Sequence, residues 1–238
     1  MKTIKLLHLY PKDMNIYGDH GNVLVLTKRL EWHGYHPTIV EYNPGDVFPD
    51  EVDLIVGGGG QDSGQNTVHQ DLLKIGGKLR QLAEEGVPML MICGLYQLFG
   101  KFFETKEGVR LEGISLLDIE TYGREARLIG NVTASSKEFG KIVGYENHSG
   151  QTFLGENVMP LALVDLGNGN NLTDGHEGAI YKHVIGSYLH GALLPKNPII
   201  ADWLIEKAVI NKYGEFNPQK IDDSLAEQAR IVAQSRPR

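Results

Sequence analysis

The sequence predicts an α/β protein in which helices flank a mostly parallel β-sheet on both faces. Short apolar runs typical of buried strands alternate with segments of helical periodicity through the first hundred residues. With 238 residues, 41% of them hydrophobic, the chain can bury the core that such a fold requires. Open parallel sheets bind ligands outside the carboxyl ends of their strands, so a functional site is expected at that edge.

The expected elements follow one another in a regular order. Strands are expected at 4–10, 36–41, 52–56 and 88–92, and helices at 21–32, at 68–85 and from Gly94 onward, the last running through 96–103. The segment from about 110 to 187 has short strands separated by glycine turns, which indicates an antiparallel addition. The tail from about 197 is expected to be helical, and Ser224-Leu225-Ala226-Glu227 match a capping box before 228–235.

Charge and cysteine content exclude several classes of protein. The net charge of −7 and the absence of a basic block argue against a general nucleic-acid surface, so small molecules or proteins are the expected partners. A single cysteine rules out an intrachain disulfide and CxxC metal sites, and no metal is expected. No apolar stretch approaches the roughly 18 residues of a membrane span, and we expect a cytoplasmic protein.

The cysteine, Cys93, lies where the apolar run 88–92 is expected to leave its strand at a sharp turn. Gly94 lets backbone pass close by, and a helix is expected to follow. The unpaired amides and positive dipole end of that helix would stabilise a thiolate and a developing oxyanion. Free cysteines are also common as small core residues, so position alone leaves a nucleophile and a core residue about equally supported.

Four glycines, Gly57 to Gly60, follow the predicted strand at 52–56. Glycine is favoured where backbone has a positive φ or approaches a ligand closely. An amide of the Gly58–Gly60 run, with Gly58 and Gly59 as the named candidates, would complete a two-donor oxyanion hole with the Gly94–Leu95 turn. A flexible turn is the alternative interpretation of the run.

His190 is the expected catalytic base among nine histidines. It ends the apolar segment 186–190, which is expected to be a strand, and glycine follows it. Paired with Cys93, its imidazole would hold the thiolate and later protonate a leaving group. Surface or core roles are expected for His8, His20, His33, His36, His69, His176 and His183.

The combination resembles the class I glutamine amidotransferases, which have an elbow cysteine, a glutamine four residues later and a distant histidine. Here these are Cys93, Gln97 and His190. The motifs at 57–62 and 187–191 are most similar to the cobyric-acid-synthase-like branch (CobB/CobQ). Within it, the segments 15–22, 127–131 and 146–150 resemble glutaminase subunits of lipid II isoglutaminyl synthases, and the similarity spans about 4–195.

The resemblance implies a flavodoxin-like three-layer glutaminase domain at 1–212, with 213–238 as a helical tail packed on it. It implies that L-glutamine is hydrolysed to glutamate and ammonia through a thioester, without a cofactor in this subunit. The chain contains no P-loop, so a Mur-ligase-like synthetase partner is expected to use ATP and Mg²⁺. That partner would amidate the α-carboxylate of D-glutamate in the lipid II stem peptide to D-isoglutamine, at the inner face of the membrane.

Substrate-binding residues are expected on three segments. Arg127 would bind the α-carboxylate of glutamine, since a guanidinium group matches a carboxylate with two parallel bonds; Arg124 is its rival. Gln97 would hydrogen-bond the substrate, although a surface glutamine on a helix is the commoner case. Asn147 and Ser149 would contact the amino-acid group of the substrate, although their segment is also a plain turn.

Two positions depart from the family pattern. Leu95 stands where a second glycine usually follows the cysteine, so a different or tighter oxyanion geometry is expected. Ala192 stands where most class I members have a glutamate, which leaves His190 without an orienting acid. The missing acid could be replaced by a carboxylate within the chain, from Glu146, Asp165 or Glu177. It could equally be replaced by a carboxylate of the partner, which would make glutaminase activity depend on assembly. Asp19 is expected to cap the helix that follows it, and a contact role is the alternative.

Other functions remain open at this point. The chain could be a cobyric-acid-synthase-like amidotransferase with another acceptor, a free-standing cysteine amidohydrolase, or a module that binds a partner without catalysis. The amidotransferase is favoured because Cys93, Gln97, Arg127 and His190 occur together.

Overall fold

The computed structural model describes residues 1–60 and 62–236, which form two β-sheets with flanking helices. The strands of the first sheet are β1 (Thr3–Leu9), β2 (His36–Tyr42), β3 (Leu54–Gly57), β4 (Met89–Ile92), β11 (Ala179–Tyr181) and β12 (Val184–Ser187). Their order is β11-β12-β4-β3-β1-β2, and every neighbouring pair is parallel except β11 with β12. The predicted α/β class is confirmed.

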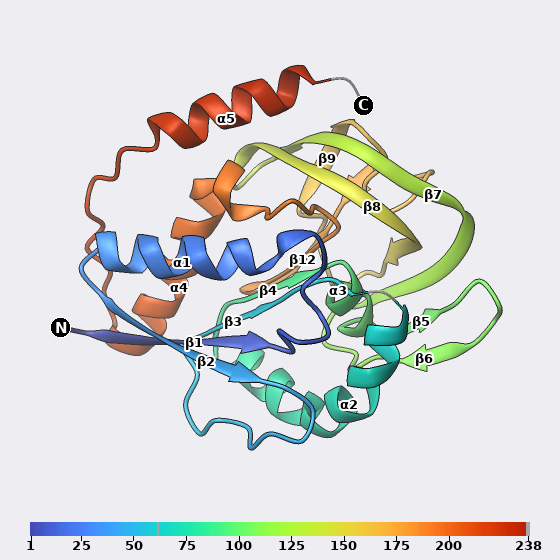
Figure 1. The fold of residues 1–238 in the computed structure, drawn as a ribbon, viewed down its shortest axis with the longest axis horizontal. Coiled ribbons are helices and arrows are strands. Elements are labelled where there is room, and N and C mark those ends of the chain that lie inside the picture. The colour runs from blue at the N-terminus through green and yellow to red at the C-terminus, as the bar shows by residue number, and fades with distance from the viewer. Residues whose placement is uncertain (61, 237–238) are drawn as a thin grey trace.

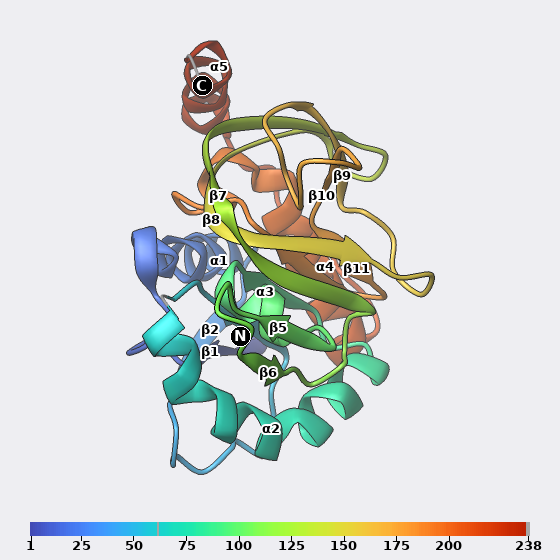
Figure 2. The same cartoon turned by 90° about the vertical axis from the view of Figure 1, so that its right-hand side faces the viewer.

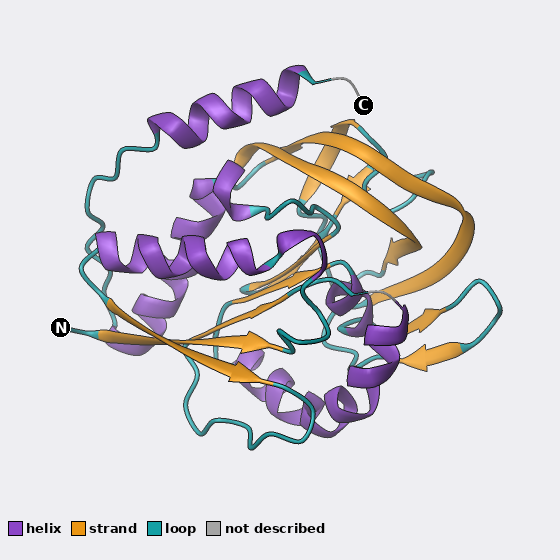
Figure 3. Cartoon of the chain, viewed as in Figure 1, coloured by secondary structure: helices purple, strands orange, loops and turns teal. Residues whose placement is uncertain are grey.

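Helices cover both faces of this sheet, which explains why its central strands are apolar throughout. Helices α1 (His20–Trp32) and α4 (Pro198–Tyr213) pack together on one face, and α2 (Asp62–Glu84) lies on the other (Figures 1 and 3). All four residues of β3 and all four of β4 are buried. A parallel strand covered on both faces has no solvent side and therefore needs no polar alternation.

The helix ends set the starts of two strands. Gly34 and Gly86 follow α1 and α2 with φ of +86° and +89°, a conformation that glycine adopts without a steric penalty. The N–H of Tyr35 donates to Leu30 O and that of Val87 to Leu82 O, at 2.9 Å in both cases, which is the Schellman pattern. Each turn directs the chain into the next strand.

The second sheet is mainly antiparallel, as predicted, but two of its strands have 18 and 15 residues instead of being short, and residues 179–187 belong to the first sheet. Its strands are β5 (Phe102–Glu104), β6 (Arg110–Glu112), β7 (Ile119–Ser136), β8 (Gly140–Leu154), β9 (Ala162–Leu166) and β10 (His176–Glu177). The order is β10-β9-β7-β5-β6, with β8 paired to β7; β5 and β7 are the parallel pair. The long β7–β8 ribbon lies in the foreground of Figure 2, on the side toward which β1 and β2 point in Figure 1.

Four local expectations are wrong. Helix α2 begins at Asp62, six residues before the predicted start at 68. The helix after Cys93, α3 (Gly94–Leu98), ends five residues before the predicted boundary, because the carbonyls of Leu98 and Phe99 accept hydrogen bonds from the 114–117 segment instead of extending the helix. The predicted strand at 186–190 stops at Ser187, because the N–H of His190 donates to Tyr145 O of β8 at 2.7 Å.

The fourth concerns the C-terminal helix α5 (Ser224–Ser235), which begins at Ser224 rather than at 228. Asp223 is its N-cap residue and makes no side-chain capping bond, so the capping box does not form. The reason is that Asp222 Oδ1 accepts the N–H of Ser224 at 3.0 Å, which makes Ser224 the first helical residue.

Helix α5 lies at the edge of the molecule and buries none of its residues (Figure 1). Its start is held by Arg29 of α1, whose guanidinium binds Asp223 at 2.6 Å and Asp202 of α4 at 2.6 Å. Near its end, Arg230 donates to Lys141 O at 2.9 Å. In the described part of the chain, no helix is both long and apolar enough to cross a membrane.

Arg29→Met is expected to lower the free energy of unfolding by about 2–3 kcal/mol. The expected loss is smaller than the ~3–5 kcal/mol that follows when one partner of a fully buried ion pair is removed, because both carboxylates that Arg29 binds are partly exposed to water. Urea unfolding measures the change, and Lys28→Met, at an exposed neighbouring position, is the control. Equal stability of the two variants would contradict the role given to Arg29.

Candidate functional site

Cys93 occupies a strained turn between β4 and α3. Its φ of +49° and ψ of −103° lie outside the regions that residues other than glycine normally adopt. The turn is held on both sides: the N–H of Cys93 donates to Ser187 O of β12 at 2.8 Å, and that of Gln97 donates to Cys93 O at 3.0 Å. The carboxyl ends of two neighbouring strands therefore fix the position of the sulfur.

Leu95 fits at the elbow because Gly57 has no side chain. Leu95 is fully buried, and a Cβ on Gly57 would collide with the side chain of Leu95. The leucine that replaces the usual second glycine is thus accommodated by a glycine on the neighbouring strand.

The glycine run owes its composition to close packing rather than to positive φ. None of Gly57 to Gly60 has a left-handed backbone, whereas added Cβ atoms would meet neighbours at each position. On Gly59, a Cβ would lie 2.7 Å from His190 Cε1 and 3.0 Å from Cys93 Cβ; on Gly58, 3.0 Å from Asp19 Cβ. Gln61, in the same motif, lies outside the described residues.

The structure brings His190 to Cys93, as predicted. His190 is fully buried and also contacts Asp19, whose Oδ1 lies 3.3 Å from Nδ1 of the imidazole. Burial alone lowers the pKa of His190, but the charge of Cys93 and hydrogen bonds with Asp19 and Cys93 outweigh it and raise the pKa to about 10. These contacts favour the protonated imidazole, which is the form that pairs with a thiolate.

Asp19 does not cap α1 with its side chain, so that prediction is wrong. Its Oδ2 accepts the N–H of Gly59 at 2.7 Å while Oδ1 faces His190, and the N–H of His20 donates to Asn15 Oδ1 instead. No periodicity or spacing in the sequence indicates this contact, because His190 lies 171 positions from Asp19. The one sequence signal is the resemblance of the 15–22 segment to the family.

A layer of buried polar side chains hydrogen-bonds to the helix that follows the Cys93 turn. Gln97 Nε2 donates to Tyr188 Oη at 3.0 Å, and Gln65 Nε2 donates to Gln97 Oε1 at 2.5 Å. Tyr188 Oη also shares a hydrogen bond with Thr152 Oγ1 at 2.7 Å, and His148 stacks on the Tyr188 ring with centroids 3.6 Å apart. Both ends of the Gln97 amide thus have protein partners, and its substrate contact stays a prediction.

Arg127 and Asn147 face each other on β7 and β8. Arg127 Nε donates to Asn147 Oδ1 at 2.8 Å beside a register shift between Gly123 and Leu128. Asn147 lies two residues beyond Tyr145, the backbone partner of His190, so both are on the ribbon that borders the site. The rival Arg124 lies over the Tyr122 ring at 5.2 Å.

The carboxylates proposed as orienting groups have other partners. Glu146 accepts hydrogen bonds from Asn168 and Gly169, and Asp165 forms a surface ion pair with Lys141 at 2.7 Å. Glu177 is buried and accepts from Ser187 Oγ at 2.6 Å and from the N–H of Tyr188 at 3.1 Å. Glu177 therefore anchors the segment that leads to His190.

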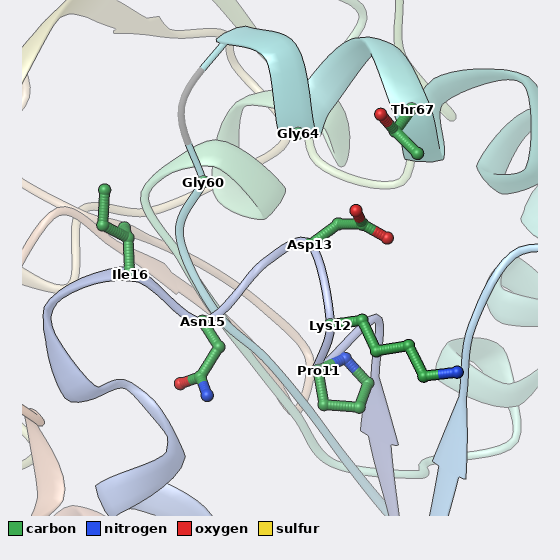
Figure 4. A pocket seen from close by; sticks show the side chains of 8 residues that line it. All are labelled: Pro11, Lys12, Asp13, Asn15, Ile16, Gly60, Gly64 and Thr67. Atoms are coloured by element: carbon green, nitrogen blue, oxygen red, sulfur yellow. The ribbon is translucent and has the colours of Figure 1, made fainter.

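A polar pocket of about 450 Å³ adjoins the glycine run on the side of the 11–16 loop (Figure 4). Gly60 belongs both to this pocket and to the run. The lining residues are Pro11, Lys12, Asp13, Asn15, Ile16, Gly60, Gly64 and Thr67.

The described part of the chain contains no cluster of three or more histidine, cysteine, aspartate or glutamate side chains arranged to bind a metal.

Comparison with known families agrees with this geometry. A profile of the CobB/CobQ-like glutamine amidotransferase domain matches residues 5–198. The chain belongs to this family.

Two relatives match nearly the whole chain. One is subunit GatD of the glutamine-hydrolysing lipid II isoglutaminyl synthase of Staphylococcus aureus, 39% identical over 98% of this chain and 95% of its own. The GatD subunit of Streptococcus pneumoniae is 36% identical over 89% and 83%. A probable cobyric acid synthase of Methanothermobacter thermautotrophicus is 34% identical over 60% of this chain but only 31% of its own length.

Solved structures agree on the fold alone. A glutamine amidotransferase matches with a TM-score of 0.61 at 17% identity, covering 85% of this chain and 98% of its own. A glutamine amidotransferase of Thermotoga maritima matches with a TM-score of 0.55 at 14% identity, covering 97% and 93%.

Gly59→Ala is expected to reduce glutamine hydrolysis by at least about 100-fold, because its methyl group would push Cys93 and His190 out of a geometry that tolerates less than about 1 Å of displacement. Gly77→Ala is the matched control, since a Cβ there meets nothing within 4 Å and alanine favours a helix. Steady-state ammonia release and thermal unfolding measure both effects. Full activity of Gly59→Ala would contradict the packing described here.

Glu177→Gln tests the buried carboxyl through the pH dependence of stability. Burial raises the pKa of Glu177 from 4.5 to about 7, although hydrogen bonds from Ser187 and Tyr188 oppose the shift. The folded protein therefore retains a proton that the unfolded chain loses between those values, so stability falls as the pH rises through this range. Between pH 5 and pH 8 the wild type should lose about 2–3 kcal/mol more than the variant in urea unfolding. An identical pH dependence would refute this assignment.

Proposed function

We propose that this chain is the glutaminase subunit of a lipid II isoglutaminyl synthase. The observation that supports the proposal most strongly is the buried Cys93–His190 pair at the β4 elbow, in a chain similar to GatD subunits over nearly its full length. The subunit would hydrolyse L-glutamine and pass ammonia to an ATP-dependent synthetase.

The reaction would begin with attack of the Cys93 thiolate on the side-chain amide carbon of glutamine, which forms a C–S bond and a tetrahedral oxyanion. The N–H of Gly59 already donates to Asp19. The proposal therefore assigns the oxyanion to the first amides of α3, Gly94 and Leu95, together with the Gly60 amide, which lies 3.2 Å from the position of a Cβ on Gly94.

His190 would act twice. As an imidazolium it donates a proton to the amide nitrogen while the C–N bond breaks, which releases ammonia and leaves a γ-glutamyl thioester. As a neutral imidazole it then takes a proton from water, whose oxygen attacks the thioester carbon. The C–S bond breaks, glutamate leaves, and the thiolate–imidazolium pair is restored.

The β7–β8 ribbon would bind the amino-acid end of the substrate. Arg127 pairs with the α-carboxylate, while Asn147 and Ser149 contact the α-amino group. Support comes from the hydrogen bond between Arg127 of β7 and Asn147 of β8, because β8 also pairs with His190 through Tyr145.

The acceptor chemistry would take place on a second protein. The two GatD relatives are named as subunits, which supports a Mur-ligase-like partner that binds ATP and Mg²⁺ and amidates D-glutamate of lipid II. Water would protonate free ammonia to ammonium, which is not nucleophilic, so the two subunits should meet around the site. The reaction would proceed in the cytoplasm, at the inner face of the membrane.

Ammonia release from L-glutamine tests the proposal, with wild type and Cys93→Ala each assayed alone and with the co-purified synthetase. Wild-type activity should exceed that of Cys93→Ala by at least about 10⁴-fold, as for other enzymes that lose their nucleophile. Activity only in the wild-type complex supports a partner-dependent glutaminase, and activity of the chain alone indicates a self-sufficient hydrolase. No activity in either state would support a binding module and contradict the proposal.

A further inference from the structure

We propose that Gln65, in the first turn of α2, is the positioning residue of Gln97. Its amide fixes which end of the Gln97 carboxamide faces Tyr188 and β8, and therefore the polarity that Gln97 presents to glutamine. The catalytic meaning of this inference rests on the proposed function and on the expected contact of Gln97 with the substrate.

The orientation of both amides is set by a backbone carbonyl of the elbow. Gln65 Nε2 donates to Gly94 O at 3.3 Å and to Gln97 Oε1 at 2.5 Å. A carbonyl oxygen can only accept, so the NH2 end of the Gln65 amide must face Gly94. Gln97 must then turn its oxygen to Gln65 and its nitrogen to Tyr188, where Nε2 donates to Oη at 3.0 Å.

Tyr188 could not set this orientation by itself. A phenolic hydroxyl can donate or accept, and Tyr188 Oη shares its other hydrogen bond, 2.7 Å long, with the hydroxyl of Thr152. Tyr188 would therefore tolerate either orientation of the Gln97 amide. Among the described residues that hydrogen-bond the Gln97 side chain, only Gln65 transmits the fixed polarity of the elbow.

Gln65 is an unfavourable residue for packing alone. Its side chain is buried, with 2% of the residue exposed, and its Oε1 has no hydrogen-bond partner in the described part of the chain. A buried acceptor without a donor destabilises the folded state, and an apolar side chain of the same length would avoid that penalty. The amide at this position is therefore explained by the two bonds that its Nε2 donates.

Two glycines leave room for the two amides. A Cβ on Gly94 would lie 2.9 Å from Gln65 Nε2, and a Cβ on Gly150 of β8 would collide with Gln97 Nε2. Gln97 Nε2 thus lies against β8 beside Ser149, one of the residues expected to contact the substrate. The end of the amide that Gln65 selects is the end that faces this part of the site.

Steady-state kinetics of glutamine hydrolysis test the inference in whichever assembly state the wild type is active. Gln65→Met keeps the length of the side chain but donates nothing, whereas Gln65→Glu presents oxygens to Gln97 and favours the reversed amide. Both variants should raise KM about tenfold, the effect of about one lost hydrogen bond, while kcat stays within about threefold. Gln70→Glu, the same change at an exposed position of α2, should leave both constants unchanged.

A double-mutant cycle with Gln97→Met separates positioning from a general disturbance of the elbow. If Gln65 acts through Gln97, Gln65→Met should change KM less than about twofold once the Gln97 amide is gone. A loss confined to kcat, or effects of the two substitutions that add fully, would overturn the inference.

The side-chain NH2 signals of Gln97 give a readout that requires no turnover. Their loss in Gln97→Met identifies them in proton–nitrogen correlation spectra of the full chain. Their hydrogens should exchange with solvent at least about tenfold faster in Gln65→Met than in the wild type, because one bond that holds the amide is gone. Equal exchange rates would overturn the inference. A wild type that hydrolyses no glutamine in any state would refute the proposed function, while the exchange rates would still decide the role of Gln65.

Discussion

The absence of side chains from Gly57 to Gly60 is the constraint on which the site depends. Each missing Cβ leaves room for a different neighbour: Leu95 at Gly57, Asp19 at Gly58, Cys93 and His190 at Gly59, and Met14 at Gly60. Segments from four parts of the chain therefore meet within van der Waals contact at the carboxyl end of β3. Because close packing leaves little freedom to relax, a single methyl group in this run affects the nucleophile and the base together.

The base of the site is enclosed by polar partners inside this packed region. His190 lies between the sulfur of Cys93 and the carboxylate of Asp19, and both contacts favour its protonated form. Glu177, ten residues before Ser187, holds the backbone that leads to His190, and the Gln97–Tyr188–Thr152 layer holds the elbow from the other side. The catalytic pair is thus fixed by hydrogen bonds that reach it from both sheets, which is what preorganised catalysis requires.

Much of this arrangement could be predicted from local patterns. Apolar runs that end in Cys93 and in the glycine run identified two strand ends, and the rule that parallel strands place their carboxyl ends at one edge brought them together. Asp19 could not be found in this way, because its contact with His190 depends on how α1 and the 187–190 segment are packed, and no periodicity encodes that. His190 was indicated by the apolar run that ends in it, but its exact position was not, because it lies beyond the end of β12 and is held by a hydrogen bond to Tyr145 O of the other sheet.

The account rests on Cys93 as the atom that attacks glutamine. An electrophilic glutamine analogue, 6-diazo-5-oxo-L-norleucine, followed by intact mass and peptide mapping, tests this most directly in the chain and in its complex. We expect one covalent adduct, located on Cys93, whose formation excess L-glutamine slows. Adduct formation on another residue, or equal labelling of the Cys93→Ala variant, would contradict the central claim.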